Sequence, residues 1–289
     1  MTITIIGGGI IGLTTAFELT ERGENVHLID AEPSDYGTAD DGTALYPAAS
    51  HYAGGMLAPI AEVQFQQDAL FPLMTASADA YPSLMGRLSR ATDLPTGYDT
   101  TGTLIVAADR ADAEHLQRTR AYYRDMNRPA DAVTPTQARA LEPLLAPRIA
   151  GAVSIPSDHQ LHPRLMRRAL KDALTRRGVT FSTERVTDPD AGDIICTGLG
   201  ATLHEDYPLR PVYGDILRLR APRPILKHVV RGYVTSRPVY LIPRPDGELC
   251  IGATSREDHR TLPAIDGVHQ LLRDAIRLVP AVEEGELLE

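Results

Sequence analysis

The sequence predicts an α/β fold (α+β in arrangement) that joins a parallel-sheet domain to a second domain with a largely antiparallel sheet. Three observations lead to this expectation. Residues 1–30 have the pattern of a strand, a glycine turn, a helix and a second strand. In residues 163–178 apolar side chains recur every three or four positions, as on one face of a helix. In residues 212–254 apolar and polar residues alternate, as they do in antiparallel strands.

The first strand is expected at Thr2–Ile6, an apolar and β-branched run typical of a buried parallel strand. Gly7–Gly12 forms the turn, and a helix follows from Ile10 to Arg22, where Gly23 favours its end. Asn25–Asp30 supplies the second strand.

The middle of the chain is expected to contain a loop, helices and a strand. The pattern predicts a loop over 32–49, helices over about 67–92, 110–126 and 136–142, and a strand at 102–106. The helix over 163–178 has a buried stripe that includes Met166, Leu170 and Leu174, and its arginines are expected to face solvent. A short buried strand at 193–196 and a last helix over about 268–279 complete the prediction.

Composition and charge exclude some functions. The net charge of −9 argues against nucleic-acid binding, which needs a basic footprint. No run is apolar and long enough to span a membrane, and the apolar start lacks the basic leader of a signal peptide. We therefore expect a cytoplasmic protein that binds neither nucleic acid nor membrane. The histidine pair His159 and His162 does not by itself predict a metal site.

The glycine turn carries a dinucleotide-binding fingerprint. Gly7, Gly9 and Gly12 have the spacing in which the first glycine permits the turn, the second lets the pyrophosphate approach and the third packs helix on sheet. The helix N-terminus then offers free N–H groups to the phosphates. Asp30, 18 residues past Gly12, is placed to bind ribose hydroxyls, and its carboxylate disfavours NADP.

The stretch after the loop favours FAD over NAD. An NAD-dependent dehydrogenase would continue with regular strand–helix repeats, but here the second strand leads to the sequence SHYAGGMLAP at 50–59. The small residues Ala53, Gly54 and Gly55 allow backbone N–H groups to approach a bulky planar group. A small-residue site for helix packing remains the alternative interpretation.

Several motifs together resemble the glycine/D-amino-acid oxidase family, and within it the glycine oxidases of thiamine biosynthesis. The resemblance covers essentially the whole chain, and its most specific pieces are AGGMLAP and YLIPR…IGAT. The full set of matching motifs is GGGIIG, Asp30, AGGMLAPIAE, HPRLM, CTGLGA, VYGDILRL and YLIPRPDG with LCIGAT.

The resemblance implies a Rossmann-like FAD-binding domain over 1–90 and 145–210 and a substrate-binding domain over 91–144 and 211–289. The implied reaction is oxidative deamination of glycine, sarcosine or small D-amino acids. A hydride passes from Cα to the flavin, O₂ takes the electrons to give H₂O₂, and the imine serves thiazole synthesis or is hydrolysed. Homo-oligomers are common in the family. A D-amino-acid oxidase or a dehydrogenase that does not use oxygen remains an alternative.

The resemblance also implies site residues. The predicted cofactor-binding residues fall in four segments of the chain. Tyr240 is predicted to lie in the substrate pocket, and packing against a neighbouring strand is the alternative role for it. The predicted FAD contacts are Gly7, Gly9, Ile10, Ile11 and Gly12 at the phosphates, Asp30 and Ala31 at the ribose, Ala49, Ser50, Gly54, Gly55 and Met56 near the diphosphate and flavin ring, and Val186 at the adenine.

The chain departs from the family pattern at three places. The loop after Asp30 contains an insertion, TADDGTALYPA, at 38–48. His51 precedes the small-residue run, where a packing role is expected rather than a covalent bond to flavin. The chain stops at Glu289, before the family's Arg-Pro-Gly-Thr-like motif, whose arginine binds the substrate carboxylate. A truncated FAD-binding fragment without turnover is therefore a further expectation, and Arg244 is expected to be structural.

Overall fold

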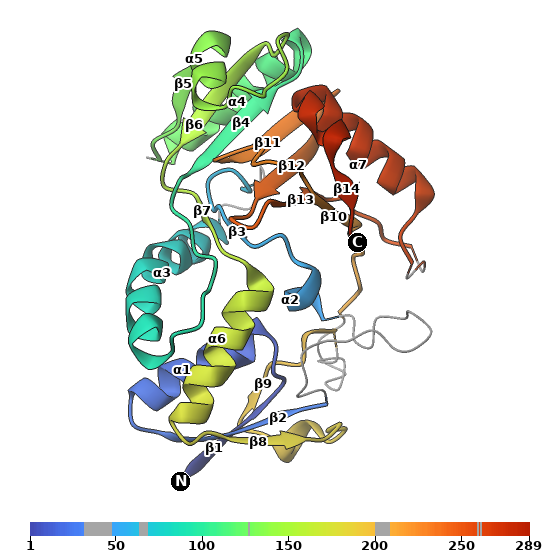
Figure 1. The fold of residues 1–289 in the computed structure, drawn as a ribbon. Helices are drawn as coiled ribbons and strands as arrows, with labels where there is room; N and C mark the ends of the chain where they lie inside the picture. Colours follow the sequence, from blue (N-terminus) through green and yellow to red (C-terminus); the bar gives the residue numbers. More distant parts are fainter. Residues whose placement is uncertain (32–47, 64–68, 127, 200–208, 259, 261) are drawn as a thin grey trace. The chain divides into compact units, whose positions relative to one another are not determined.

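A computed structural model describes residues 1–31, 48–63, 69–126, 128–199, 209–258, 260 and 262–289 (Figure 1). The chain divides into two compact units. Unit 1 comprises residues 1–53, 82–97 and 162–211, and unit 2 comprises residues 54–81, 98–161 and 212–289. Most of the loop expected at 32–49, including nearly all of the TADDGTALYPA insertion, lies outside the described residues.

The unit boundaries differ from the domain boundaries expected from the sequence. Residues 54–81 and 145–161 fall in unit 2. The reason is strand pairing: β6 (Gly151–Ile155) pairs with β4 (Thr103–Ala107), and β3 (Met56–Leu57) pairs with β7 (His159–Gln160). Which unit binds cofactor and which binds substrate stays a prediction.

Unit 1 contains a four-stranded parallel sheet in the order β8-β2-β1-β9. The outer strands β8 (Thr180–Thr183) and β9 (Ile194–Ile195) flank β2 (Asn25–Asp30) and β1 (Thr2–Ile6). Ile5 and Leu28 pair across β1 and β2 and are almost fully buried. The apolar runs therefore form the central strands, as the sequence predicts.

The helices of unit 1 include α1 (Ile10–Glu21) and α6 (Pro163–Arg176), which lie side by side over the sheet (Figure 1). Met166, Leu170 and Leu174 of α6 are buried, which confirms the predicted stripe. The expectation that all its arginines face solvent is wrong for Arg167, which is buried near the glycine turn. The unit also holds the short helix α2 (Ala49–Tyr52) and the 3₁₀ turn η1 (Pro189–Ala191).

Unit 2 contains an eight-stranded sheet in the order β14-β10-β13-β12-β11-β4-β6-β5. All neighbours are antiparallel except β11 and β4, which run parallel. The prediction of a second, largely antiparallel sheet is thus confirmed. The remaining strands are β5 (Asp131–Val133), β10 (Ile216–Arg220), β11 (Val229–Val234), β12 (Arg237–Pro243), β13 (Glu248–Gly252) and β14 (Glu286–Leu287).

The main core of unit 2 lies on one face of this sheet. Leu271, Ala275 and Leu278 of α7 (Ile265–Leu278) are buried in a cluster with Val230 and Leu241 of the central strands. The other face carries a second cluster that includes Ile105 and Tyr233. The other helices are α4 (Arg110–Asp125), α5 (Pro135–Leu141) and the 3₁₀ turn η3 (Pro280–Glu284), while α3 (Phe71–Ala91) crosses a unit boundary at Tyr81–Pro82.

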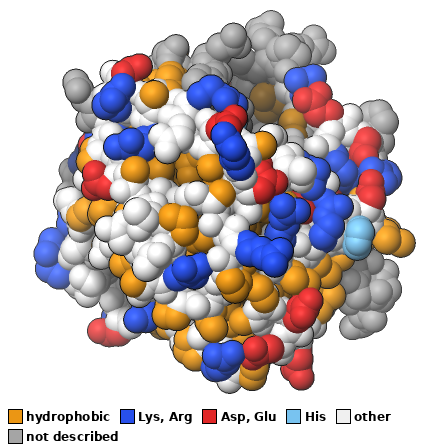
Figure 2. All heavy atoms as spheres, turned by 90° about the horizontal axis from the view of Figure 1, so that it is seen from above, with side chains coloured by type: hydrophobic (Ala, Val, Ile, Leu, Met, Phe, Trp, Pro, Cys, Tyr) orange, Lys and Arg blue, Asp and Glu red, His pale blue; other side chains and the backbone are white. Residues whose placement is uncertain are grey.

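The face of the molecule drawn in Figure 2 carries side chains of both charges. Figure 2 shows Lys and Arg side chains intermixed with acidic and apolar side chains on one face of the molecule. A basic footprint for a nucleic-acid backbone would instead gather cations without acids between them. Among the helices in the described ranges, not one combines the length and apolar character needed to cross a bilayer.

Candidate functional site

The glycine turn connects β1 to α1 and fits the dinucleotide prediction. Gly7 has φ = 107°, a left-handed conformation that favours glycine, and its N–H donates to the Ile29 carbonyl at 2.7 Å. A Cβ on Gly12 would lie 1.9 Å from the Gly7 carbonyl oxygen, so only glycine permits this close packing. Gly9 caps α1 without a side chain, which leaves the first-turn N–H groups of Ile11 and Gly12 suited to an anion.

Ser50 of α2 lies against this turn. Its hydroxyl oxygen accepts a hydrogen bond from the Ile10 backbone N–H at 3.0 Å. A Cβ on Gly9 would lie 3.4 Å from the same oxygen, with no other heavy atom within 4 Å among the described residues. The structure therefore brings together Ser50, Gly9 and Ile10, three residues that the sequence predicts at the phosphates.

Asp30 ends β2 beside the glycine turn. A Cβ on Gly8 would lie 2.2 Å from the Asp30 carboxylate, so that carboxylate lies directly over the turn. The Asp30 carbonyl accepts from the Glu184 N–H at 3.1 Å, and half-buried Val186 follows two residues later. The predicted ribose and adenine residues, including Ala31, thus gather at one end of the parallel sheet.

These residues fit the ADP part of a dinucleotide. Space for phosphates next to a backbone requires a position without a Cβ atom, and Gly9 provides it, because a Cβ there would meet only the Ser50 hydroxyl, at 3.4 Å, among the described atoms. Arg167, which the sequence interpretation assigned to solvent, brings a guanidinium nitrogen 3.4 Å from the Gly8 carbonyl. Its buried cation adds positive charge near the turn. The sequence carries no sign of this burial, because Arg167 is one of several arginines in an amphipathic helix.

The AGGML segment is held within unit 2 by Arg244. This buried guanidinium donates to the Leu161 carbonyl and the Gln160 side chain, each at 2.9 Å, and to the Gly54 carbonyl. The Gly55 carbonyl accepts from the Leu161 N–H at 2.9 Å, and Met56 pairs with Gln160. The expectation that Arg244 is structural agrees with these contacts.

Tyr240 of β12 packs against the same segment. A Cβ on Gly54 would lie 3.3 Å from the Tyr240 hydroxyl, and one on Gly252 would lie 2.4 Å from it. The two glycines therefore make room for the Tyr240 ring, which is half-buried. Burial raises the pKa of the Tyr240 phenol well above its ordinary value, so this hydroxyl stays a hydrogen-bond donor at neutral pH.

Asp158 is a buried carboxyl group that the sequence interpretation missed. It accepts hydrogen bonds from the N–H groups of Ile60, at 3.3 Å, and Ala61, at 2.7 Å. Burial raises its pKa to about 7, against the opposing effect of these two N–H donors. The segment that follows Met56 is thus anchored by a group that titrates near neutral pH.

His51 lies in α2 near the predicted cofactor residues. Its carbonyl oxygen accepts from the Arg164 Nε–H at 3.0 Å, and its ring meets the Tyr52 ring edge-on at 4.9 Å between centroids. These contacts fit the packing role expected from the sequence.

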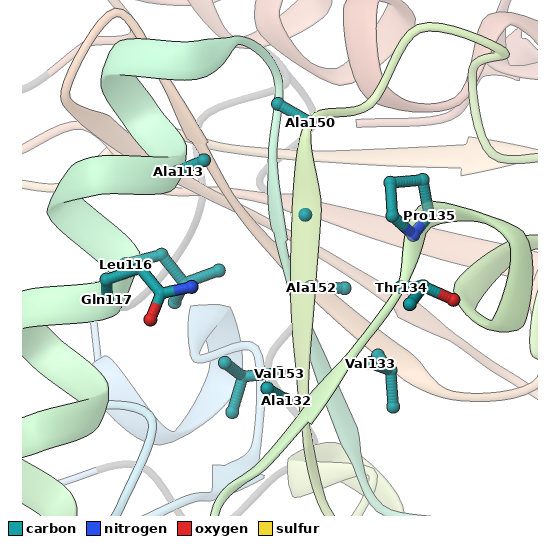
Figure 3. A pocket seen from close by; sticks show the side chains of 11 residues that line it. Ala113, Leu116, Gln117, Ala132, Val133, Thr134, Pro135, Ala150, Ala152 and Val153 are labelled. Carbon is teal, nitrogen blue, oxygen red and sulfur yellow. The ribbon is translucent and has the colours of Figure 1, made fainter.

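An open cavity of about 260 Å³ lies in unit 2 between α4, β5 and β6 (Figure 3). Its walls are small and mostly apolar, with Gln117 and Thr134 as polar side chains. Among the described residues that line it, none has an ionisable side chain and none belongs to the predicted site. The cavity therefore supplies no acid, base or nucleophile for catalysis.

Comparison with known proteins identifies the family. The family model described as DAO, FAD dependent oxidoreductase, matches residues 2–289, which is nearly the whole chain. The chain belongs to the FAD-dependent oxidoreductase family. The resemblance inferred from the glycine turn, AGGMLAP and YLIPR is thereby confirmed, and with it the expected fold class.

Individual members of this family extend the comparison. The glycine oxidase of Geobacillus kaustophilus is 30% identical over 98% of this chain and 78% of its own length. A crystal structure of glycine oxidase from that organism superposes with a TM-score of 0.82 at 28% identity, covering 99% of this chain and 80% of the other. A bifunctional ThiO/ThiG protein from Nostoc is 28% identical over 99% of this chain, which spans 45% of that relative's length.

Proposed function

We propose that this chain binds FAD and oxidises the amine of glycine, sarcosine or a small D-amino acid, with O₂ as the electron acceptor. One observation carries the proposal furthest. The two most specific motifs, AGGMLAP and YLIPR, lie far apart in sequence yet contact each other through Gly54 with Tyr240 and Arg244. The 30% identity to a glycine oxidase favours the same substrate class.

Each group of residues has a separate task in this proposal. Gly7, Gly9, Ile10, Ile11 and Gly12 would hold the diphosphate, with Ser50 and Ala49 beside them. Asp30 and Ala31 would bind the ribose, and Val186 the adenine. Gly54, Gly55 and Met56 would approach the flavin ring.

Bound FAD would supply the redox chemistry, a two-electron oxidation of the amine with hydride loss from Cα and O₂ as the final acceptor, which gives peroxide. The protein contributes position and hydrogen bonds. The protonated phenol of Tyr240 would donate to an oxygen of the substrate. The imine product would be hydrolysed to an oxo acid and ammonia or be used in thiazole synthesis. A homo-oligomeric state also remains part of the proposal.

Two measurements test this function. The purified chain should be yellow or should take up FAD, with flavin absorbance in the protein peak. Peroxide release should then be measured with glycine, sarcosine, D-alanine and D-proline. A chain that takes up no FAD refutes the proposal. A strong preference for D-proline over glycine would favour a D-amino-acid oxidase, and flavin reduction without peroxide would favour a dehydrogenase.

A further inference from the structure

One face of helix α6 reaches two of the predicted cofactor segments in unit 1. The Arg164 Nε–H donates to the His51 carbonyl at 3.0 Å, and Arg167 Nη2 donates to the Gly8 carbonyl at 3.4 Å. Residues three apart in a helix lie on the same face. His51 follows Ser50 in α2, and Gly8 lies inside the glycine turn, so α6 holds the backbone of both segments (Figure 1).

Arg167 occupies a position where an apolar side chain would be expected. It lies beside Met166 and Leu170 of the buried stripe and is only 8% exposed, whereas the next residue, Arg168, is exposed. A guanidinium stays charged when it is buried, so its removal from water costs free energy that polar contacts must offset. Methionine or leucine at this position would avoid that cost. The arginine therefore indicates a use for its charge and its donors at the Gly8 carbonyl.

The peptide that Arg167 holds lies in a run of glycines. Gly7, Gly8 and Gly9 are consecutive, and Gly7 has φ = 107°. Glycine populates many backbone conformations, so a peptide between glycines rotates easily unless contacts fix it. The Asp30 carboxylate lies 2.2 Å from the position that a Cβ on Gly8 would take, and Arg167 donates to the carbonyl of the same residue. These two contacts fix the orientation of Gly8.

The orientation of this peptide decides where the Gly9 N–H points. The bond between Gly8 and Gly9 is trans, so the Gly9 N–H points opposite to the Gly8 carbonyl and away from the guanidinium. A hydrogen bond from a cation to the carbonyl also polarises the peptide, which makes the N–H a stronger donor. Gly9 caps α1, and a Cβ there would meet only the Ser50 hydroxyl, at 3.4 Å, among the described atoms. Arg167 therefore prepares a donor at a position that is open to a ligand.

We infer that Arg167 is a positioning residue of the cofactor site, which holds the Gly8 carbonyl so that the Gly9 N–H is available to the diphosphate of the dinucleotide. The inference rests on the proposed function, because it assigns a further residue of this chain to FAD binding. A diphosphate is an anion, so the buried cation also favours it through its charge. The effect of Arg167 should therefore fall on the phosphates and spare the adenosine part of the cofactor.

Two ligands, one with phosphates and one without, test this role. ADP and adenosine should each be titrated against the apoprotein by saturation-transfer NMR. Arg167→Met should weaken ADP binding at least about fivefold, because it removes the charged donor at the Gly8 carbonyl, and should leave adenosine binding within about twofold of the wild type. Arg167→Lys keeps the cation without the planar guanidinium and should recover part of the ADP affinity.

Arg176→Met is the matched control, because it removes the same charge from the same helix. The Arg176 side chain is 51% exposed and pairs with Asp172, one turn away, at 2.9 Å. This variant should bind ADP within about twofold of the wild type, since exposed pairs contribute little. Thermal melting checks that each variant is folded. If Arg167→Met does not fold, Arg167→Lys takes its place and should bind ADP more weakly than the wild type, with adenosine binding unchanged.

The inference is overturned if the folded Arg167 variant binds ADP as tightly as the wild type. It is also overturned if that variant loses ADP and adenosine affinity by the same factor, as a general loosening of unit 1 would require, or if Arg176→Met weakens ADP binding equally. A wild type that binds neither ADP nor FAD refutes both the inference and the proposed function. A chain that binds ADP with the help of Arg167 but oxidises none of the four amines refutes the function alone.

Discussion

The hydroxyl of Ser50 accepts a hydrogen bond from the N–H of Ile10 at 3.0 Å, which links two predicted cofactor segments separated by 40 positions in sequence. Ile10 is the first residue of α1, where N–H groups lack partners within the helix. Ser50 therefore supplies the partner that the Ile10 N–H lacks within the helix, and it joins α2 to the glycine turn.

Ser50→Ala should weaken FAD binding to the apoprotein about fivefold, because the loss of one hydrogen bond costs about 1 kcal/mol. Quenching of FAD fluorescence during titration measures this change. Ser89→Ala is the matched control, since the Ser89 hydroxyl bonds to the Gly86 carbonyl on an exposed part of α3 in the same unit. Equal FAD affinities for wild type and Ser50→Ala would count against Ser50 as a cofactor residue.

Gly12→Ala should abolish FAD binding and lower the free energy of unfolding by about 2 kcal/mol or more, because its Cβ would overlap the Gly7 carbonyl oxygen at 1.9 Å. Gly86→Ala provides the comparison. Gly86 lies in α3, and a Cβ there meets no described atom within 4 Å, so this change should stabilise the protein by up to about 1 kcal/mol. Chemical denaturation and FAD titration of both variants check the contrast.

The sequence predicts unit 1 well because its signals are local. A glycine triplet between two apolar strands specifies its own turn, and the Met166–Leu174 stripe specifies the buried face of α6. The burial of Arg167 is not predicted, because the sequence pattern does not distinguish one buried arginine from the exposed arginines of the same helix. Its burial follows from the tertiary position of Gly8, about 160 residues away in sequence.

Unit 2 is less predictable for a related reason. Alternation identifies β11 and β12 as strands, but the pairing of Arg231 with Tyr240 depends on the turn at Thr235 and Ser236, where both residues have positive φ. Asp158 lies in the connection between β6 and β7 and has no sequence signal of burial. Its role appears only when the chain brings Ile60 and Ala61 to it.

Asp158 should make stability depend on pH. Its pKa is raised from 3.8 to about 7, so the native state binds this proton more tightly than the unfolded chain does. The wild type should therefore lose stability relative to Asp158→Asn as pH rises from about 4 to about 7, by up to about 3 kcal/mol. Urea denaturation of both proteins at pH 5 and 7.5 measures this. A difference that does not change with pH would contradict the raised pKa.

Arg244→Met should remove the hydrogen bond between the YLIPR motif and the Gly54 carbonyl. Arg244 is 6% exposed, and its loss leaves the Gly54 and Leu161 carbonyls and the Gln160 side chain without this donor. We expect the free energy of unfolding to fall by about 3 kcal/mol, since each buried unpaired acceptor costs about 1–3 kcal/mol with partial relaxation. Urea denaturation measures this loss.

Arg110→Met is the control for Arg244→Met, since the Arg110 side chain is 94% exposed and its pair with Glu114, itself 63% exposed, is a surface ion pair. It should change stability by less than about 1 kcal/mol. Peroxide assays on the folded variants then separate two roles of Arg244. If the Arg244→Met variant has a higher KM for glycine at unchanged FAD affinity, then the position of Gly54 controls substrate binding. An unchanged KM would limit Arg244 to stability, because the Gly55–Leu161 hydrogen bond and the Met56–Gln160 pairing would then suffice to hold Gly54 in place.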